Sequence, residues 1–190
     1  MRLFEALLEN LNLTVIDVES TCWKTEEEKS DQENEVIEIG ICNLIKGKIH
    51  KIPSIIVKPE HSRVSEFCTQ LTTLTQDKVD RGVTPKYAYS KLEKYFVSKT
   101  WARWGDYDMN QLERMFELYS IPNILPPNHV NIRLLYAQKI IGSDNPQDAP
   151  SNPKDAMEKL GMTFKGVNHR GDDDAYNIAR LYLEVVNFEE

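Results

Sequence analysis

Two acidic residues, Asp17 and Glu19, lie at the end of an apolar segment that reads LNLTVIDVESTCW over residues 11–23. The alternation of residue types along this segment predicts a β-strand. A period of two places both carboxylates on one face of that strand, about 6.5–7 Å apart. Carboxylates this close repel one another, whereas a divalent cation takes their oxygens as ligands. The pair predicts a metal site, and the alternative is an edge strand whose two carboxylates are simply solvated.

Two further aspartates each begin a helix on the face that packs into the core. Asp108 follows a short aromatic segment and shares a helical face with Leu112 and Met115, in a helix predicted over residues 106–119. Asp174 lies in the same way at the start of a helix predicted over residues 172–186. Either carboxylate could therefore reach a site in the core, although an N-cap role is the alternative for Asp108.

A histidine precedes the last of these aspartates by five positions, in the segment NHRGDDDA over residues 168–175. His169 is expected on a loop beside Gly171, from which its imidazole could take a proton from an attacking water. A surface histidine ahead of a helix is the alternative for His169 alone. Four separated acidic residues that face one core, together with a loop histidine, are difficult to explain as structural features.

The remaining pattern predicts the elements that would position these side chains. Residues 35–43 and 49–58 read as an antiparallel hairpin around Lys46-Gly47-Lys48, so three successive strands form a meander. Helices are expected over residues 3–11, 65–74, 75–81, 85–98, 130–142 (led by a short strand) and 153–160, a strand over residues 100–105, and a charged loop over residues 24–35.

Composition limits the class of protein. The 190 residues, of which 41% are hydrophobic, fit a single domain, and no apolar run is long enough for a membrane span. The net charge of −7 argues against a protein that coats nucleic acid, but not against an enzyme that grips a few nucleotides. Three widely spaced cysteines argue against a disulfide framework, and MRLFEALLEN does not resemble a secretory signal, so a cytoplasmic location is expected.

The spacing Asp17-x-Glu19, then Asp108, then His169-x4-Asp174 resembles the three motifs of the DEDDh 3′→5′ exonucleases. Arg170 stands where the tyrosine-type variant would carry its tyrosine, so the histidine type is the match. Within that superfamily the chain is most similar to the ERI-like exoribonucleases, over about residues 11–186. Five blocks carry this resemblance: VIDVESTCW, EVIEIG, FCTQLTTLTQDKVDRG, WGDYD and HRGDDDAYNIARL. One departure is Thr73, where these enzymes usually have glycine.

The resemblance implies an α/β protein with a ribonuclease H-like fold, in which helices flank a central mixed sheet of an antiparallel meander plus parallel strands. It also implies two Mg²⁺ or Mn²⁺ ions that support in-line hydrolysis of a phosphodiester. By the match, Asp17, Glu19 and Asp174 hold one ion, Asp17 bridges to the second, and Asp108 completes the set directly or through water. His169 would be the general base, and the product would be a nucleoside 5′-monophosphate from a 3′ end.

Aromatic residues near the motifs suit stacking on unpaired bases. Trp23, Phe67 and Tyr107 are the candidates, Leu71 could wedge against the terminal base, and Val18, between the motif carboxylates, is a further expected substrate contact. Phe67 and Leu71 could instead be core residues of their helix. Trp101 and Trp104 are assigned to the core.

Three functions remain open from the sequence. The first is an exoribonuclease acting on single-stranded 3′ ends, with RNA favoured over DNA and with no membrane or obligate protein partner. The second is a DEDDh exonuclease acting on DNA, because the motifs do not read the 2′-hydroxyl. The third is a catalytically silent nucleic-acid-binding module, against which the intact set of five motif residues argues.

Overall fold

The computed structural model of the chain describes residues 11–188, and its centre is a five-stranded mixed sheet with strand order β3-β2-β1-β4-β5. β1 (Asn12–Ser20), β2 (Val36–Ile45) and β3 (Lys48–Ile56) form the predicted antiparallel meander. β4 (Thr100–Arg103) pairs in parallel with β1, and β5 (Asn128–Asn131) pairs in parallel with β4. The expected mixed sheet is therefore confirmed, whereas the helix predicted over residues 3–11 falls almost wholly outside the described residues.

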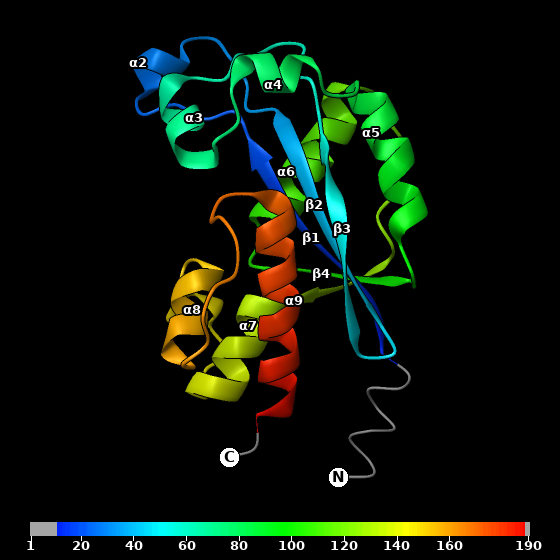
Figure 1. The fold of residues 1–190 in the computed structure, drawn as a ribbon, viewed down its shortest axis with the longest axis vertical. Coiled ribbons are helices and arrows are strands. Elements are labelled where there is room, and N and C mark those ends of the chain that lie inside the picture. The colour runs from blue at the N-terminus through cyan, green and yellow to red at the C-terminus, as the bar shows by residue number, and fades with distance from the viewer. Residues whose placement is uncertain (1–10, 189–190) are drawn as a thin grey trace.

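Helices cover both faces of this sheet (Figure 1). On one face, α9 (Gly171–Asn187) packs with α7 (Ile132–Tyr136) and α8 (Pro153–Lys159) against Leu13 and Val15 of β1. On the other face, α5 (Pro85–Leu92) and α6 (Tyr107–Leu118) pack against Ile16 and Val18 of the same strand. Because alternate residues of β1 enter two different cores, the strand is mostly apolar before Asp17, with the buried Thr14 as an exception.

Short helices lie beyond the ends of β1 and β2 (Figure 1). α3 (Glu66–Thr72) and α4 (Gln76–Asp80) lie in the two ranges predicted as helices, and the side chains of Ser65 and Thr75 cap their first turns. The segment predicted as a charged loop contains α2 (Glu26–Lys29), a single turn capped by the Thr25 hydroxyl. Three other short elements complete the described chain: the 3₁₀ turns Glu93–Tyr95 and Pro146–Asp148 and the π-helical turn Ala137–Ile141.

The helix predicted over residues 85–98 is too long, because α5 ends at Leu92 and is followed by the 3₁₀ turn. Two buried polar side chains of the sheet explain why α5 ends there. Asn43 Nδ2 and Thr14 Oγ1 both donate to the Tyr95 carbonyl, at 3.1 and 3.3 Å, and the Val97 amide donates to Thr14 Oγ1. The sheet therefore takes the backbone groups that a longer helix would have used.

Within residues 11–188, no helix is both long and apolar enough to cross a bilayer. Trp101 and Trp104 are buried at 0% and 6% exposure, which confirms their assignment to the core.

Candidate active site

Three carboxylates from the two ends of the chain meet beside the end of β1. Asp17 and Glu19 lie on the same face of the strand, the face covered by α9, and Asp174 comes from the first turn of α9. One oxygen from each of these side chains lies within 4.8 Å of the others. Carboxylate oxygens at this spacing are the ligands that a hard divalent cation prefers. The structure thus brings together three of the four predicted ligands.

A close contact between two glycines allows α9 to approach β1 and β2. Gly40 of β2 lies opposite Asp17 in the antiparallel register. A Cβ atom on Gly40 would stand only 1.8 Å from the carbonyl oxygen of Gly171, the first residue of α9. Only a residue without a side chain fits there, and the contact places the first turn of α9, with Asp174, over the end of β1.

Asp108 reaches the site from the opposite face of the sheet. The ladder between β1 and β4 pairs Thr14 and Val15 with Trp101 and Ala102, and beyond it the first turn of α6 enters beside β1. Asp108 is 3% exposed, and its Oδ1 accepts from the Val18 amide at 3.0 Å. Asp106, not Asp108, occupies the N-cap position, so the N-cap alternative for Asp108 is wrong. Asp108 is not in the group of three converging carboxylates.

Burial raises the pKa of all four motif carboxyls, and neighbouring carboxylates raise it further for Asp17, Glu19 and Asp174. For Asp17 the causes are burial and then the charges of Asp108, Asp174 and Glu19. Burial, followed by the charge of Asp174, raises the pKa of Glu19 to about 9. Burial also raises the pKa of Asp108 and of Asp174 to about 7, against the opposing hydrogen bonds from backbone amides. A divalent cation among these groups would favour their charged forms, so the donor set fits such an ion.

His169 lies on the loop that leads into α9, as predicted, in a left-handed conformation with φ of +61°. It is half-buried, and burial together with the charge of Lys154 lowers the pKa of its imidazole. A lower pKa keeps the ring neutral at pH 7, the form that can accept a proton. His169 is not in the group of converging carboxylates, and its role as a base stays a prediction.

The five residues expected to contact substrate differ in exposure. Phe67 and Tyr107 are 37% and 51% exposed, so the core alternative for Phe67 is wrong, while Trp23 and Leu71 are half-buried. The Val18 side chain is 3% exposed and packs in the core, and its amide is bonded to Asp108. A side-chain contact from Val18 is therefore excluded, because the strand alternation turns it away from Asp17 and Glu19.

A cavity of about 790 Å³ lies next to these aromatic residues. Trp23 and Phe67 line it together with two basic residues, Lys24 and Arg63, and two acidic residues, Glu28 and Glu66. Its wall is tied to the end of β1, because Ser65 Oγ donates to the Cys22 carbonyl at 2.6 Å and Cys68 Sγ contacts the Ser20 carbonyl at 3.5 Å. The cavity is large enough for a small ligand.

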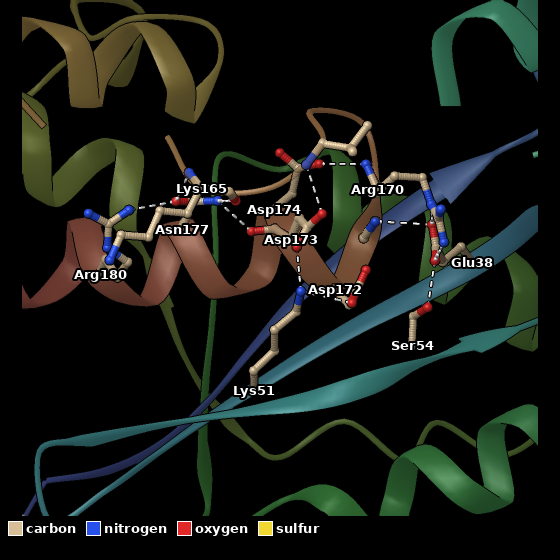
Figure 2. Close-up of polar contacts among 12 residues, drawn as sticks. Glu38, Lys51, Ser54, Lys165, Arg170, Asp172, Asp173, Asp174, Asn177 and Arg180 are labelled. Carbon is tan, nitrogen blue, oxygen red and sulfur yellow. Dashed lines mark hydrogen bonds and ion pairs between the residues drawn. The ribbon is translucent and has the colours of Figure 1, made fainter. Parts of the chain in front are cut away.

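Sequence reasoning missed two residues beside the carboxylates, Glu38 and Arg170. Glu38 is 0% exposed, and both of its oxygens accept from the Arg170 guanidinium at 2.9 and 3.0 Å (Figure 2). The available signal was a single glutamate inside the apolar run VIEIGI, since a charge in a buried strand needs a partner.

Comparison with known proteins places these features in a wider group. The exonuclease family model RNase_T matches residues 14–182. ERI1 exoribonuclease 2 of Xenopus laevis is 31% identical over 92% of the chain, and the chain spans 28% of that protein's length. The nuclease domain of 3′hExo, a DEDDh family member bound to rAMP, superposes with a TM-score of 0.73 at 26% identity, covering 92% of this chain and 91% of that one.

A second solved structure, of a 3′-exonuclease that recognises the 3′ end of the histone mRNA stem-loop, gives a TM-score of 0.76 at 27% identity. It covers 92% of this chain and 81% of that one. These likenesses confirm the predicted ribonuclease H-like α/β fold and the resemblance to the DEDDh and ERI-like enzymes.

Proposed function

Because the chain belongs to the exonuclease family RNase_T, we propose that it is a 3′→5′ exoribonuclease that shortens single-stranded RNA and releases nucleoside 5′-monophosphates. The observation that carries this proposal is the convergence of Asp17, Glu19 and Asp174, with one oxygen of each within 4.8 Å of the others. The pKa values of these carboxyls are raised, and a bound divalent cation would lower them by favouring the charged forms. The chemistry of the donors therefore supports a metal-dependent hydrolysis.

Two Mg²⁺ or Mn²⁺ ions would supply electrostatic stabilisation to the attacking and leaving oxygens of an in-line displacement. Asp17, Glu19 and Asp174 would hold one ion, and Asp17 would also be a ligand of the second. Asp108 would complete the set, directly or through water, with the oxygen that does not accept from the Val18 amide. His169 would take the proton from the attacking water, because its lowered pKa keeps it neutral at pH 7.

The substrate would enter as an unpaired strand. The exposed rings of Phe67 and Tyr107, with Leu71 beside Phe67 on α3, suit the terminal base, since stacking tolerates any sequence. The next nucleotide upstream would occupy the cavity lined by Trp23, where Lys24 and Arg63 can contact the phosphate of that nucleotide. RNA is favoured because the ERI1 relative is named an exoribonuclease, and a DNA substrate is the second candidate.

We also propose that residues 1–190 belong to a single exonuclease domain, of which the family resemblance covers about residues 11–186, and that it needs no protein partner for the reaction. A cytoplasmic location remains our expectation, because Cys22, Cys42 and Cys68 are all free thiols.

The test is degradation of matched, 5′-labelled single-stranded RNA and DNA by the purified chain in Mg²⁺ or Mn²⁺. Stepwise shortening from the 3′ end, release of monophosphates and an intact circular RNA are expected. Excess EDTA and the substitution Asp17→Asn should each abolish the reaction. Cleavage of the circle would mean an endonuclease, full activity in EDTA would exclude the metal site, and preferential decay of DNA would favour the second candidate.

A further inference from the structure

The Glu38 carboxylate is the most completely buried acidic group beside the site. It projects from β2 on the face of Glu19, to which it is directly opposite in the antiparallel register. Four donors surround it: Ser54 Oγ at 2.5 Å, Arg170 Nε at 3.0 Å, Arg170 Nη2 at 2.9 Å and the Gly171 amide at 3.1 Å (Figure 2). A buried carboxylate with two oxygens bonded in this way accepts a planar guanidinium in one orientation only.

The partner, Arg170, stands between the two predicted functional groups of the C-terminal motif. Its backbone amide donates to Asp174 Oδ2 at 2.8 Å, and its carbonyl accepts from the Asp174 amide, also at 2.8 Å. The residue before it is His169, at φ of +61°. The side chain of Arg170 is therefore fixed to the sheet, while its main chain is bonded to a proposed metal ligand.

A second set of contacts joins the same end of α9 to the sheet and provides a comparison. Lys51 of β3 bridges Asp172, at 2.9 Å, and Asp173 (Figure 2). Asp173 also accepts from the Val167 amide at 2.8 Å. This bridge holds the helix to the sheet through the two aspartates that precede Asp174, and Lys51 is more exposed than either of them.

We propose that Glu38 and Arg170 are positioning residues, whose ion pair fixes the main chain at residue 170. The fixed main chain directs the Asp174 carboxylate toward Asp17 and Glu19, and it holds the turn at His169 in place. The inference rests on the proposed function, because it assumes that these carboxylates bind a divalent cation. Neither residue touches the reacting atoms. The effect of losing the pair comes through Asp174, whose carboxylate would lose a fixed amide donor.

The experiment measures Mn²⁺ affinity by calorimetry without substrate, and kcat and KM on a single-stranded RNA oligomer. Arg170→Met should weaken Mn²⁺ binding and lower kcat by about 10–100-fold each, the usual effect of a group that supports a metal ligand, with KM unchanged. Arg170→Lys keeps the charge but not the paired geometry and should recover part of the loss. Lys51→Met, the matched control at the same helix end, should leave Mn²⁺ affinity and kcat unchanged.

Arg170→Met leaves a buried charge on Glu38 and could unfold the protein. The double variant Glu38→Gln with Arg170→Met removes both charges, and it should fold while keeping the weak Mn²⁺ binding. Parental Mn²⁺ affinity in the double variant, or an equal loss in Lys51→Met, would overturn the positioning role. If the parent protein binds Mn²⁺ but degrades no nucleic acid, the proposed function fails while the affinity comparison still decides this inference.

Discussion

Replacing Asp17 by asparagine should stabilise the protein in EDTA and destabilise it, relative to the parent, in Mg²⁺. The oxygens of Asp17, Glu19 and Asp174 lie within 4.8 Å of one another. At that separation two unit charges repel by about 1 kcal/mol in water and about 3.5 kcal/mol at an effective dielectric constant of 20. Partial protonation of the raised-pKa carboxyls reduces this repulsion. Asp17→Asn should therefore gain about 1–3 kcal/mol without metal.

For a chain of this length, 1 kcal/mol corresponds to about 2–4 °C in the unfolding midpoint. Thermal unfolding in EDTA at pH 8.5 should show Asp17→Asn melting about 2–12 °C above the parent. Mg²⁺ at 1,000 times its Kd should reverse the order, because it stabilises the parent by about 4.1 kcal/mol, which exceeds the gain of the variant, and the variant has lost a ligand. Asp31→Asn, at an exposed aspartate of the segment around α2, is the control and should change neither midpoint. A variant less stable than the parent in EDTA would refute the metal-site reasoning and assign Asp17 a structural role.

Four further outcomes are expected. His169→Ala should lower the single-turnover rate by about 10²–10⁴-fold while oligomer binding in Ca²⁺ is preserved. The rate of the parent should fall at acid pH with a midpoint below the ordinary histidine pKa of 6.5, since burial and the charge of Lys154 lower the pKa of His169. His50→Ala, at an exposed histidine of β3, should match the parent, and equal rates for the two variants would exclude His169 as the base. In EDTA, the contribution of Glu19 to folding stability should be full below about pH 4.5 and be lost as the pH rises toward 9, because the folded pKa of Glu19 lies above its unfolded value. Denaturant titrations in which Glu19→Gln gains no stability over the parent as the pH rises through this range would contradict this. Thr73→Gly should raise the free energy of unfolding by about 0.5–1 kcal/mol, because Thr73 ends α3 at φ of +62°; a urea midpoint that falls would count against it. Arg63→Gln should weaken oligomer binding and reduce by about 0.7 the magnitude of the slope of log binding constant against log salt concentration. It should leave hydrolysis of the p-nitrophenyl ester of thymidine 5′-monophosphate unchanged, and Lys48→Gln, at the distant hairpin turn, should alter neither property. Equal binding of oligomer by both variants would place the nucleic acid elsewhere.

Local sequence determined much of the scaffold. A period of two along residues 11–19 was enough to put Asp17 and Glu19 on one face of β1, since strand geometry leaves no other arrangement. Hydroxyl residues at Ser65, Thr75 and Thr84 marked the starts of α3, α4 and α5, because a side-chain oxygen satisfies the first free amides of a helix. Helical periodicity likewise placed Asp108 and Asp174 on buried faces.

Tertiary contacts decided the rest. The end of α5 depends on Thr14 and Asn43, which lie 81 and 52 positions from Tyr95 and donate hydrogen bonds to its carbonyl. The pairing of Glu38 with Arg170 spans 132 positions, and the contact of Gly171 with Gly40 spans 131. Pattern and propensity describe neighbours along the chain, whereas a buried charge or a backbone contact is satisfied by whichever group the fold brings to it. For this reason the sequence could nominate Asp17, Glu19 and Asp174 as ligands, but only the packing of α9 on β1 and β2 places their oxygens within reach of one cation.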